Sequence, residues 1–311
     1  MSTGRGRSLA SLLVAIVAAM PWVGKSAYDR GGNGIPAFAN IAHRGASGCA
    51  PEATRPAFEQ AVAAGADYLE MDIQMSRDGH LVAIHDTELD RTTDGSGRVG
   101  EHTLAELKAL DAGSWFNRAH PGQADPAYAG VRLLTLDEIL EAFGPERRYY
   151  IETKSPELYP GVERKLIEVL QAHGLIERGS VVLQSFSADS LKELRALNAD
   201  VPLIQLLWYG RSADGEWVEA SGNTPPLSSS GVADLRAIAH YAAGIGPNVE
   251  DGEQRVVDAA FVRRAHRAGL LVHVYTVDDT ATMNELIDAG VDGIFTNFPA
   301  RLDRVLDRRA D

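Results

Sequence analysis

Cysteine is almost absent from this sequence of 311 residues. Cys49 is the single example, so no intramolecular disulfide can form and burial of apolar side chains must hold the folded state together. Hydrophobic residues make up 45% of the chain, an ordinary globular composition that is sufficient for a core. Small residues flank Cys49 without an activating partner nearby in sequence, which indicates a loop residue rather than a reactive thiol.

Positive charge is also in short supply. Lys and Arg number 30 against 43 Asp and Glu, and the formal net charge is -13. No local basic cluster interrupts this excess of acid, so nucleic acids and anionic membrane surfaces are not expected as partners.

Long hydrophobic runs are absent except near the N-terminus. One run covers residues 9–23 and follows Arg5 and Arg7; it is short for a membrane span and has the layout of a secretory signal. We therefore expect residues 1–27 to be a signal peptide and the protein to be exported, either secreted or kept in the periplasm or cell envelope. Lys25 disturbs the cleavage pattern, so an uncleaved N-terminal anchor is the alternative.

After a glycine-rich linker at 28–38, short apolar runs alternate with helical patterns, as in repeated βα units. The eight runs are FANIAH, YLEMDIQ, YYIETK, VVLQSF, PLIQLL, GIGPNV, LVHVYT and GIFTN. Helices begin at capping boxes at Thr103 and Thr135, each with Glu three residues later. This pattern predicts a single (β/α)₈ barrel domain over residues 39–311, with its active site at the C-terminal strand ends.

Two segments interrupt the repeat. LVAIHD follows the second run after a short link that contains Asp78 and Gly79, a hairpin signal too short for a parallel crossover. We expect a hairpin excursion that folds back on the second strand. Residues 210–231 are rich in Gly, Ser and Pro and are expected to be an inserted surface loop or lid.

The second barrel strand carries two acids. Glu70 and Asp72 are two residues apart, so they face the same side of the strand. On a half-exposed strand they would simply be solvated. Inside a barrel, both need a positively charged partner, and a divalent metal ion would supply one.

The next strand repeats the spacing with Glu152 and Lys154. A plain ion pair is one interpretation. The other makes Glu152 a third oxygen ligand beside Glu70 and Asp72, and leaves Lys154 to bind an anion. Three carboxylates without clustered thiols favour Ca²⁺ or Mg²⁺ over zinc.

Two histidines are predicted to flank these acids. If the hairpin turn centres between residues 77 and 78, His85 lies directly opposite Glu70. His43 and Arg44 end the first strand, where side chains leave the core. Paired histidines acting as base and acid, together with cations that neutralise phosphate oxygens, fit hydrolysis of a phosphate ester.

Three aromatic residues are candidates for the substrate pocket. Trp115 and Phe116 precede Glu152 in a loop and would floor the pocket, with ordinary loop packing as the alternative. His273 and Tyr275 share a strand near its end; a structural hydrogen-bonded role is at least as well supported for this histidine as a functional one.

Five segments together resemble the glycerophosphodiester phosphodiesterases. In chain order they are HRGASGCAPEAT, EMDIQMSRDGHLVAIHD, LDRTTDGSG, ETK and DGIFTNFP. The resemblance covers about residues 41–302, and IAHYAAGIGPN with the long insert before it resembles the exported, periplasmic type of this family.

The resemblance implies a role for each candidate residue. His43 and His85 would be the acid/base pair, and Tyr275 a pocket residue. The other implied roles are phosphate contacts from Arg44 and Lys154, divalent metal ligands from Glu70, Asp72 and Glu152, and indirect support of the site from Glu52.

The sequence departs from the family pattern at three positions. Ala53 replaces the asparagine of a Pro-Glu-Asn-Thr motif and cannot make an amide hydrogen bond. Tyr275 and Asn297 stand where the family often has tryptophan and aspartate, which alters the pocket floor and the hydrogen bonding at a strand end.

The predicted activity is metal-dependent hydrolysis of a glycerophosphodiester to sn-glycerol 3-phosphate and an alcohol. The resemblance implies that the glycerol 2-hydroxyl attacks phosphorus, and we favour His43 as base and His85 as leaving-group acid. One alternative is a phospholipase D-type hydrolase acting on lysophospholipid or sphingomyelin; the other is a non-catalytic phosphate-ester binding protein. The sequence leaves the alcohol, the metal and the oligomeric state open.

Overall fold

A computed structural model of the chain describes Met1 and residues 35–222, 232–252 and 254–310. The predicted signal peptide, Met1 apart, and most of the 28–38 linker lie outside these residues. No helix in the described part of the chain is long and apolar enough to cross a membrane.

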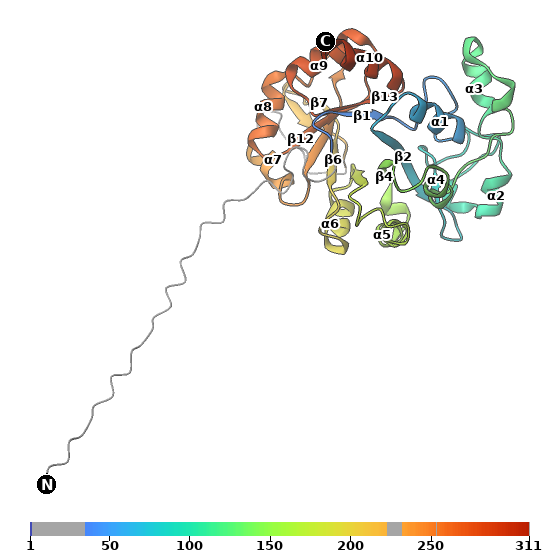
Figure 1. Ribbon diagram of the computed structural model, residues 1–311, viewed down its shortest axis with the longest axis horizontal. Helices are drawn as coiled ribbons and strands as arrows, with labels where there is room; N and C mark the ends of the chain where they lie inside the picture. Colours follow the sequence, from blue (N-terminus) through green and yellow to red (C-terminus); the bar gives the residue numbers. More distant parts are fainter. Residues whose placement is uncertain (2–34, 223–231, 253, 311) are drawn as a thin grey trace.

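Eight parallel strands close into a barrel (Figure 1). They are β1 (Ala39–Ala42), β2 (Tyr68–Met75), β4 (Arg148–Thr153), β5 (Val181–Ser185), β6 (Leu203–Leu207), β9 (Gly244–Pro247), β12 (Leu271–Val274) and β13 (Gly293–Thr296), and β3 (Leu81–Ala83) is added antiparallel to β2. Closure occurs because β1 pairs with both β13 and β2. The predicted (β/α)₈ barrel is therefore confirmed.

Helices connect the strands and cover the outside of the barrel. They are α1 (Arg55–Ala63), α4 (Leu136–Phe143), α5 (Val162–Ala172), α6 (Ala188–Leu197), α7 (Val232–Ile238), α8 (Ala259–Arg267), α9 (Thr280–Ala289) and α10 (Pro299–Ala310), with a short 3₁₀ turn η4 (Pro156–Leu158) ahead of α5. The capping box predicted at Thr135 begins α4, with the Glu138 side chain completing it. Such caps satisfy backbone N–H groups that have no partner inside the helix.

The barrel interior is filled by large side chains rather than by solvent. The Tyr150 ring packs edge-on against Tyr68 and Phe295, with centroids 5.4 Å and 5.0 Å away. The hydroxyl of Tyr150 is hydrogen-bonded to Nδ1 of His273 at 2.9 Å, and burial lowers the pKa of His273 to about 4. His273 is thus a neutral structural residue in the barrel core.

The hairpin between β2 and β3 is present, but its register differs from the predicted one. Met75 lies opposite Leu81, and the Ser76 N–H donates to the His80 carbonyl, which leaves three residues, 77–79, in the loop itself. Gly79 has a left-handed φ of 85°. A register shift of one residue moves every side chain of a strand to the other face. The prediction that His85 lies directly opposite Glu70 was therefore wrong, because the assumed two-residue turn is a three-residue loop.

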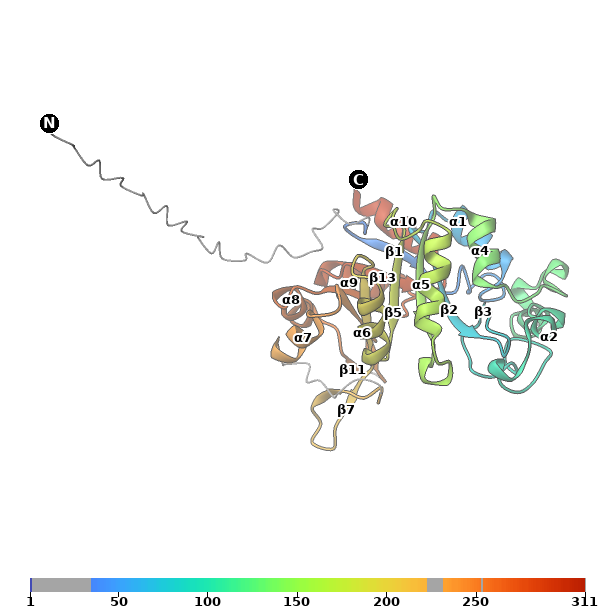
Figure 2. The same cartoon turned by 90° about the horizontal axis from the view of Figure 1, so that it is seen from below.

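The chain between β3 and β4 forms an extension beside the barrel (Figure 2). Its elements are η1 (Val99–Glu101), α2 (Leu104–Ala109), α3 (Ser114–Ala119), η2 (Pro121–Gln123) and η3 (Pro126–Tyr128). The predicted capping box at Thr103 begins α2. A separate small core of Val82, Leu89, Leu107 and Leu133 holds the extension against β3.

The segment expected to be an irregular insert contains regular structure in its described part. Strands β7 (Tyr209–Arg211) and β8 (Trp217–Glu219) pair antiparallel, and the hairpin projects from the barrel in Figure 2. A second small ribbon joins β10 (Glu250–Asp251) to β11 (Gln254–Arg255). Residues 223–231 of the predicted insert lie outside the described residues.

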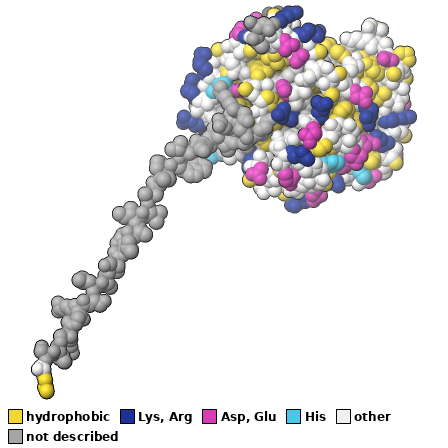
Figure 3. Space-filling view, viewed as in Figure 1, with side chains coloured by type: hydrophobic (Ala, Val, Ile, Leu, Met, Phe, Trp, Pro, Cys, Tyr) yellow, Lys and Arg dark blue, Asp and Glu magenta, His cyan; other side chains and the backbone are white. Residues whose placement is uncertain are grey.

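The surface drawn in Figure 3 carries charges of both signs. Lys and Arg side chains lie among Asp and Glu side chains on this face, with apolar side chains scattered between them. This face therefore presents no extended basic region of the kind that nucleic acids need.

Candidate active site

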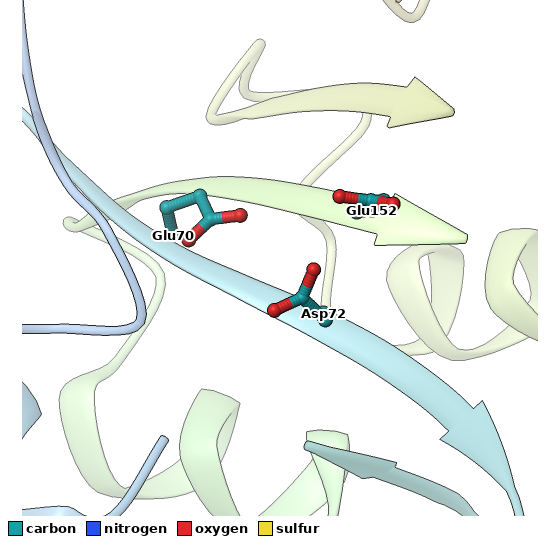
Figure 4. A group of neighbouring side chains, drawn as sticks. All are labelled: Glu70, Asp72 and Glu152. Atoms are coloured by element: carbon teal, nitrogen blue, oxygen red, sulfur yellow. The ribbon is translucent and has the colours of Figure 1, made fainter. Parts of the chain in front are cut away.

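Three carboxylates meet at the point where β2 and β4 run side by side. Asp72 is the parallel register partner of Glu152, and Glu70 is two residues back along β2. All three side chains are buried, and one oxygen from each lies within 4.8 Å of the others. Figure 4 shows the three side chains on the two neighbouring strands. The strand spacing read from the sequence thus brings the predicted acids together.

Two positively charged side chains contact these three carboxylates. The Lys154 ammonium lies 2.8 Å from Glu152 Oε1 and 3.3 Å from Asp72 Oδ1. The Arg44 guanidinium Nε lies 3.0 Å from Asp72 Oδ2, and its backbone N–H donates to Glu70 Oε2 at 2.7 Å. With all three carboxylates ionised, the two positively charged side chains leave the buried cluster one positive charge short of balance.

The three acids differ in the direction in which their surroundings shift the pKa. Burial raises the pKa of Glu70 well above its usual range and that of Glu152 to about 7. Burial acts in the same direction on Asp72, but Lys154 and Arg44 hold the pKa of this carboxyl well below its usual range. A bound divalent cation would favour the ionised form of all three acids.

Buried oxygen atoms that lack hydrogen bonds support a metal at this place. Asp72 Oδ2 has none, because its contact with Arg44 Nε is poorly aligned, and Gln184 Oε1 also has none. Gln184 is adjacent, since its Nε2 donates to Glu70 Oε1 at 3.0 Å. An oxygen-only donor set suits a hard cation such as Ca²⁺ or Mg²⁺, so the residues present fit the predicted metal.

His43 follows β1 and has a fixed tautomer. Its Nδ1 lies 2.8 Å from Asn297 Oδ1, while Asn297 Nδ2 donates to the Asp278 carboxylate at 2.7 Å. Because a carboxylate only accepts, the amide orientation is set, and His43 Nδ1 must carry the proton. Burial, followed by the Arg44 charge, lowers the pKa of His43 to about 3.

His85 reaches the site from the end of β3 rather than from within the strand. Its Nδ1 lies 2.6 Å from Asp86 Oδ1, so this ring also holds its proton on Nδ1. Burial lowers the pKa of His85, and the Asp72 charge opposes that shift. Both histidines therefore turn Nδ1 toward a protein acceptor, which leaves Nε2 for the substrate.

A cavity of about 250 Å³ joins these groups. Its lining comprises the predicted residues His43, Arg44, Glu70, His85, Glu152, Lys154 and Tyr275, together with Gln184, Phe186, Leu206, Trp208, Thr276 and Phe295. One wall is charged and the other apolar, as expected of a site for a small polar ester.

Trp115 and Phe116 do not line this cavity, so their predicted place in the substrate pocket was wrong. Phe116 is fully buried and packs edge-on against Tyr128, with ring centroids 5.7 Å apart. Trp115 packs on the same small cluster beneath the loop after β1. Phe186 and Trp208 supply the aromatic wall instead, at the ends of strands β5 and β6.

The loop after β1 supports the site through Glu52. The Glu52 carboxylate accepts a hydrogen bond from Arg44 Nη1 at 3.1 Å, in line with its predicted supporting position. The neighbouring Ala53 has a left-handed φ of 55° and donates its N–H to the Arg44 carbonyl. Asparagine adopts this conformation more readily than alanine, which gives a physical reason for the asparagine of the family motif.

Replacing Ala53 with glycine is expected to leave the free energy of unfolding unchanged or to raise it by up to about 1.6 kcal/mol. Glycine removes a left-handed penalty of about 1–2 kcal/mol, against about 0.4–1 kcal/mol of added entropy in the unfolded chain. The control Ala61→Gly, in the helical backbone of α1, should lower it by about 1 kcal/mol or more. Urea unfolding measures both, and equal losses would contradict the strain at Ala53.

The fold and the chemistry of the site together define the class of protein. Groups suited to binding a metal, neutralising a phosphate and moving protons meet at the C-terminal ends of barrel strands, where (β/α)₈ enzymes carry their active sites. The arrangement is that of a barrel enzyme suited to the hydrolysis of phosphate esters.

Comparison with known proteins gives the family. The profile of the Glycerophosphoryl diester phosphodiesterase family matches residues 43–301, and the chain belongs to this family. The glycerophosphodiester phosphodiesterase of Bacillus subtilis is 44% identical over 269 residues, which are 85% of each chain. That of Caldanaerobacter subterraneus is 35% identical over 84% of this chain and 95% of its own. The predicted family and enzyme class are confirmed.

Solved structures of similar proteins share the fold. A putative glycerophosphoryl diester phosphodiesterase from Silicibacter pomeroyi superposes with a TM-score of 0.71 at 26% identity, over 88% of this chain and 95% of that one. A phosphodiesterase from Oleispira antarctica, solved in complex with the product sn-glycerol-3-phosphate, gives a TM-score of 0.69 at 27% identity, over 86% and 96% of the two chains.

Proposed function

We propose that this enzyme hydrolyses glycerophosphodiesters to sn-glycerol 3-phosphate and an alcohol, and that it uses Ca²⁺ or Mg²⁺ held by Glu70, Asp72 and Glu152. The observation that carries the proposal is the buried carboxylate cluster, with its oxygens within 4.8 Å, two members of which, Glu70 and Glu152, line one cavity with His43 and His85. The product found in the Oleispira antarctica relative supports the choice of substrate class.

The charged wall of the cavity binds the phosphodiester. The cation, when bound, would polarise the phosphoryl group and offset the charge that develops on its oxygens. Arg44 and Lys154 line the same cavity and provide N–H donors for these oxygens. The apolar wall, which includes Phe186 and Phe295, excludes water from the reacting group.

The two histidines transfer the protons, and the residues that hold them indicate which histidine is the base and which is the acid. His43 is held by a neutral amide and has a pKa of about 3, so it is unprotonated and suited to accept the proton of the glycerol 2-hydroxyl as that oxygen attacks phosphorus. His85 is held by the Asp86 carboxylate, which opposes the lowering of its pKa by burial and would stabilise an imidazolium once a proton is taken up. It is suited to protonate the alcohol oxygen as the P–O bond breaks, which leaves a glycerol 2,3-cyclic phosphate. Water then adds to the phosphorus and gives a proton to His85, while His43 returns its proton to the 2-oxygen, and sn-glycerol 3-phosphate is released.

The headgroup experiment compares glycerophosphocholine with lysophosphatidylcholine. We expect choline and sn-glycerol 3-phosphate from the first and little choline from the second. Trp208, 46% exposed, is the one large exposed apolar side chain among the described residues that lines the cavity. The cavity therefore offers little exposed apolar surface for the acyl chain of a lysophospholipid. Faster release from the lysophospholipid would favour the phospholipase D-type alternative, and binding of both without product would favour the non-catalytic one.

Export of the protein is a further part of the proposal. It rests on the sequence of residues 1–27, a short apolar run behind two arginines. Sequencing the N-terminus of protein recovered outside the cytoplasm tests it: a start near residue 27 is expected, and an intact N-terminus would favour an anchor.

A further inference from the structure

Arg91 makes an unusual set of contacts next to the cavity, although it is not one of the cavity-lining residues described. Its guanidinium binds two carboxylates at once. Nε and Nη2 donate to Asp86 at 2.5 Å and 3.2 Å, and Nη1 and Nη2 donate to Glu52 at 2.8 Å and 2.7 Å. The residue belongs to the LDRTTDGSG segment, which the proposed mechanism leaves without a role.

Each of these two carboxylates also accepts a hydrogen bond from a residue of the site. Asp86 Oδ1 accepts from Nδ1 of His85 at 2.6 Å. Glu52 Oε1 accepts from Nη1 of Arg44 at 3.1 Å. Through these two carboxylates, Arg91 is therefore linked both to the histidine assigned as the acid and to the arginine assigned to the phosphate.

The geometry depends on the guanidinium and not only on its charge. Two forks of N–H donors fix the planes of the two carboxylates, and those planes in turn fix the ring of His85 and the head of Arg44. The ammonium of a lysine is a point charge that cannot form both forks. The two carboxylates come from different loops, one after β1 and one after β3, so Arg91 also sets the distance between them.

We propose that Arg91 is a positioning residue that holds His85 and Arg44 in register with each other through Asp86 and Glu52. This inference rests on the proposed function, because the two residues that it positions are the acid and the phosphate contact of that reaction. The simpler interpretation is an ion-pair network that only fastens two loops. Arg91 is 42% exposed, and pairs this exposed add little to stability.

The first test measures kcat and KM for glycerophosphocholine. We expect Arg91→Ala to lower kcat/KM by about 100-fold, the effect of a misplacement near 1 Å, and Arg91→Lys to lose nearly as much. Because the side chain is partly exposed, guanidinium ion added to Arg91→Ala should restore part of the loss. The control Arg77→Ala removes an arginine of the connection between β2 and β3, 56% exposed and paired with Glu106 of the extension, and should leave both constants unchanged.

The partner variants separate the two arms of the network. Asp86→Asn is expected to act mainly on kcat, through His85, and Glu52→Gln mainly on KM, through Arg44. Adding Arg91→Ala to Asp86→Asn should then cost little more in kcat than Asp86→Asn alone, because neighbours in one network are not additive.

Three results would overturn the proposal: kcat and KM of folded Arg91→Ala within about twofold of the unsubstituted enzyme, full activity of Arg91→Lys, or additive losses in the double variant. A readout without turnover separates this from a failure of the proposed function. The Nδ1–H resonance of His85 in a ¹⁵N-edited NMR spectrum should be protected in the unsubstituted protein and lost in Arg91→Ala. An unchanged resonance would contradict the positioning role whatever the substrate.

Discussion

Replacing His85 with alanine is expected to lower kcat by about 100-fold to 10,000-fold, the range found when a general acid is removed. The loss should fall on the breaking of the bond to the alcohol, because His85 is the group held by a carboxylate and facing the cavity. Affinity for Ca²⁺ or Mg²⁺ should change little, since the proposed ligands are Glu70, Asp72 and Glu152. Steady-state release of sn-glycerol 3-phosphate and calorimetric metal titration measure the two quantities.

His80→Ala is the matched control for this experiment. His80 directly precedes β3, whereas His85 follows it, and its side chain is exposed, so its replacement should leave turnover unchanged. Near-normal turnover of His85→Ala would remove this residue from the mechanism, and equal losses in the two variants would point to damage to the β2–β3 hairpin rather than to the loss of an acid.

The second large effect is expected for Asp72→Asn. Asp72 is the acid that both Lys154 and Arg44 contact, and its pKa is the one held low. Its neutral replacement removes a proposed metal ligand and releases both cations from their common anchor. Divalent cation binding should fall sharply and kcat/KM by about 1,000-fold or more, corresponding to several kcal/mol of transition-state stabilisation.

Asp90→Asn provides the comparison for Asp72→Asn. Asp90 is exposed in the extension after β3, where its carboxylate accepts a hydrogen bond from the Gly97 N–H. Its replacement should keep metal affinity and activity. Unaltered metal affinity in Asp72→Asn would show that the ion, if bound, lies elsewhere.

The barrel strands could be predicted from the sequence because each is a short apolar run bounded by helical patterns. Parallel strands buried on both faces give such runs, and the observed β5, Val181–Ser185, lies within the predicted VVLQSF. The register of β3 could not be predicted as well. An Asp-Gly pair is compatible with two-residue and three-residue hairpin loops, and the choice depends on the backbone conformation that Gly79 adopts.

Within the site, the residues found from sequence are those whose spacing along one strand fixes their direction. Glu70 with Asp72, and Glu152 with Lys154, are examples. The contacts that orient the histidines were not predicted, because they join distant parts of the chain: His43 and Asn297 are 254 residues apart. The misplacement of Trp115 has the same origin, since packing of helix α3 under the first βα connection leaves no local signal.

Gln184 is a residue of the site that could have been predicted from the sequence. It is a polar residue within the apolar run VVLQSF, and it proves to be buried and bonded to Glu70. A single buried amide on the inward face of a barrel strand needs a partner. That requirement is a usable signal for a residue beside a charged site.

The central claim is that the buried acidic cluster binds a divalent cation needed for hydrolysis of a glycerophosphodiester. The most direct measurement strips the enzyme with a chelator, then follows sn-glycerol 3-phosphate release from glycerophosphocholine while Ca²⁺ or Mg²⁺ is added back. The account predicts no release from the stripped enzyme and a saturable return of activity with one of the two ions, and no return in Asp72→Asn. Full activity of the stripped enzyme, or a return of activity in Asp72→Asn equal to that of the unsubstituted enzyme, would contradict it.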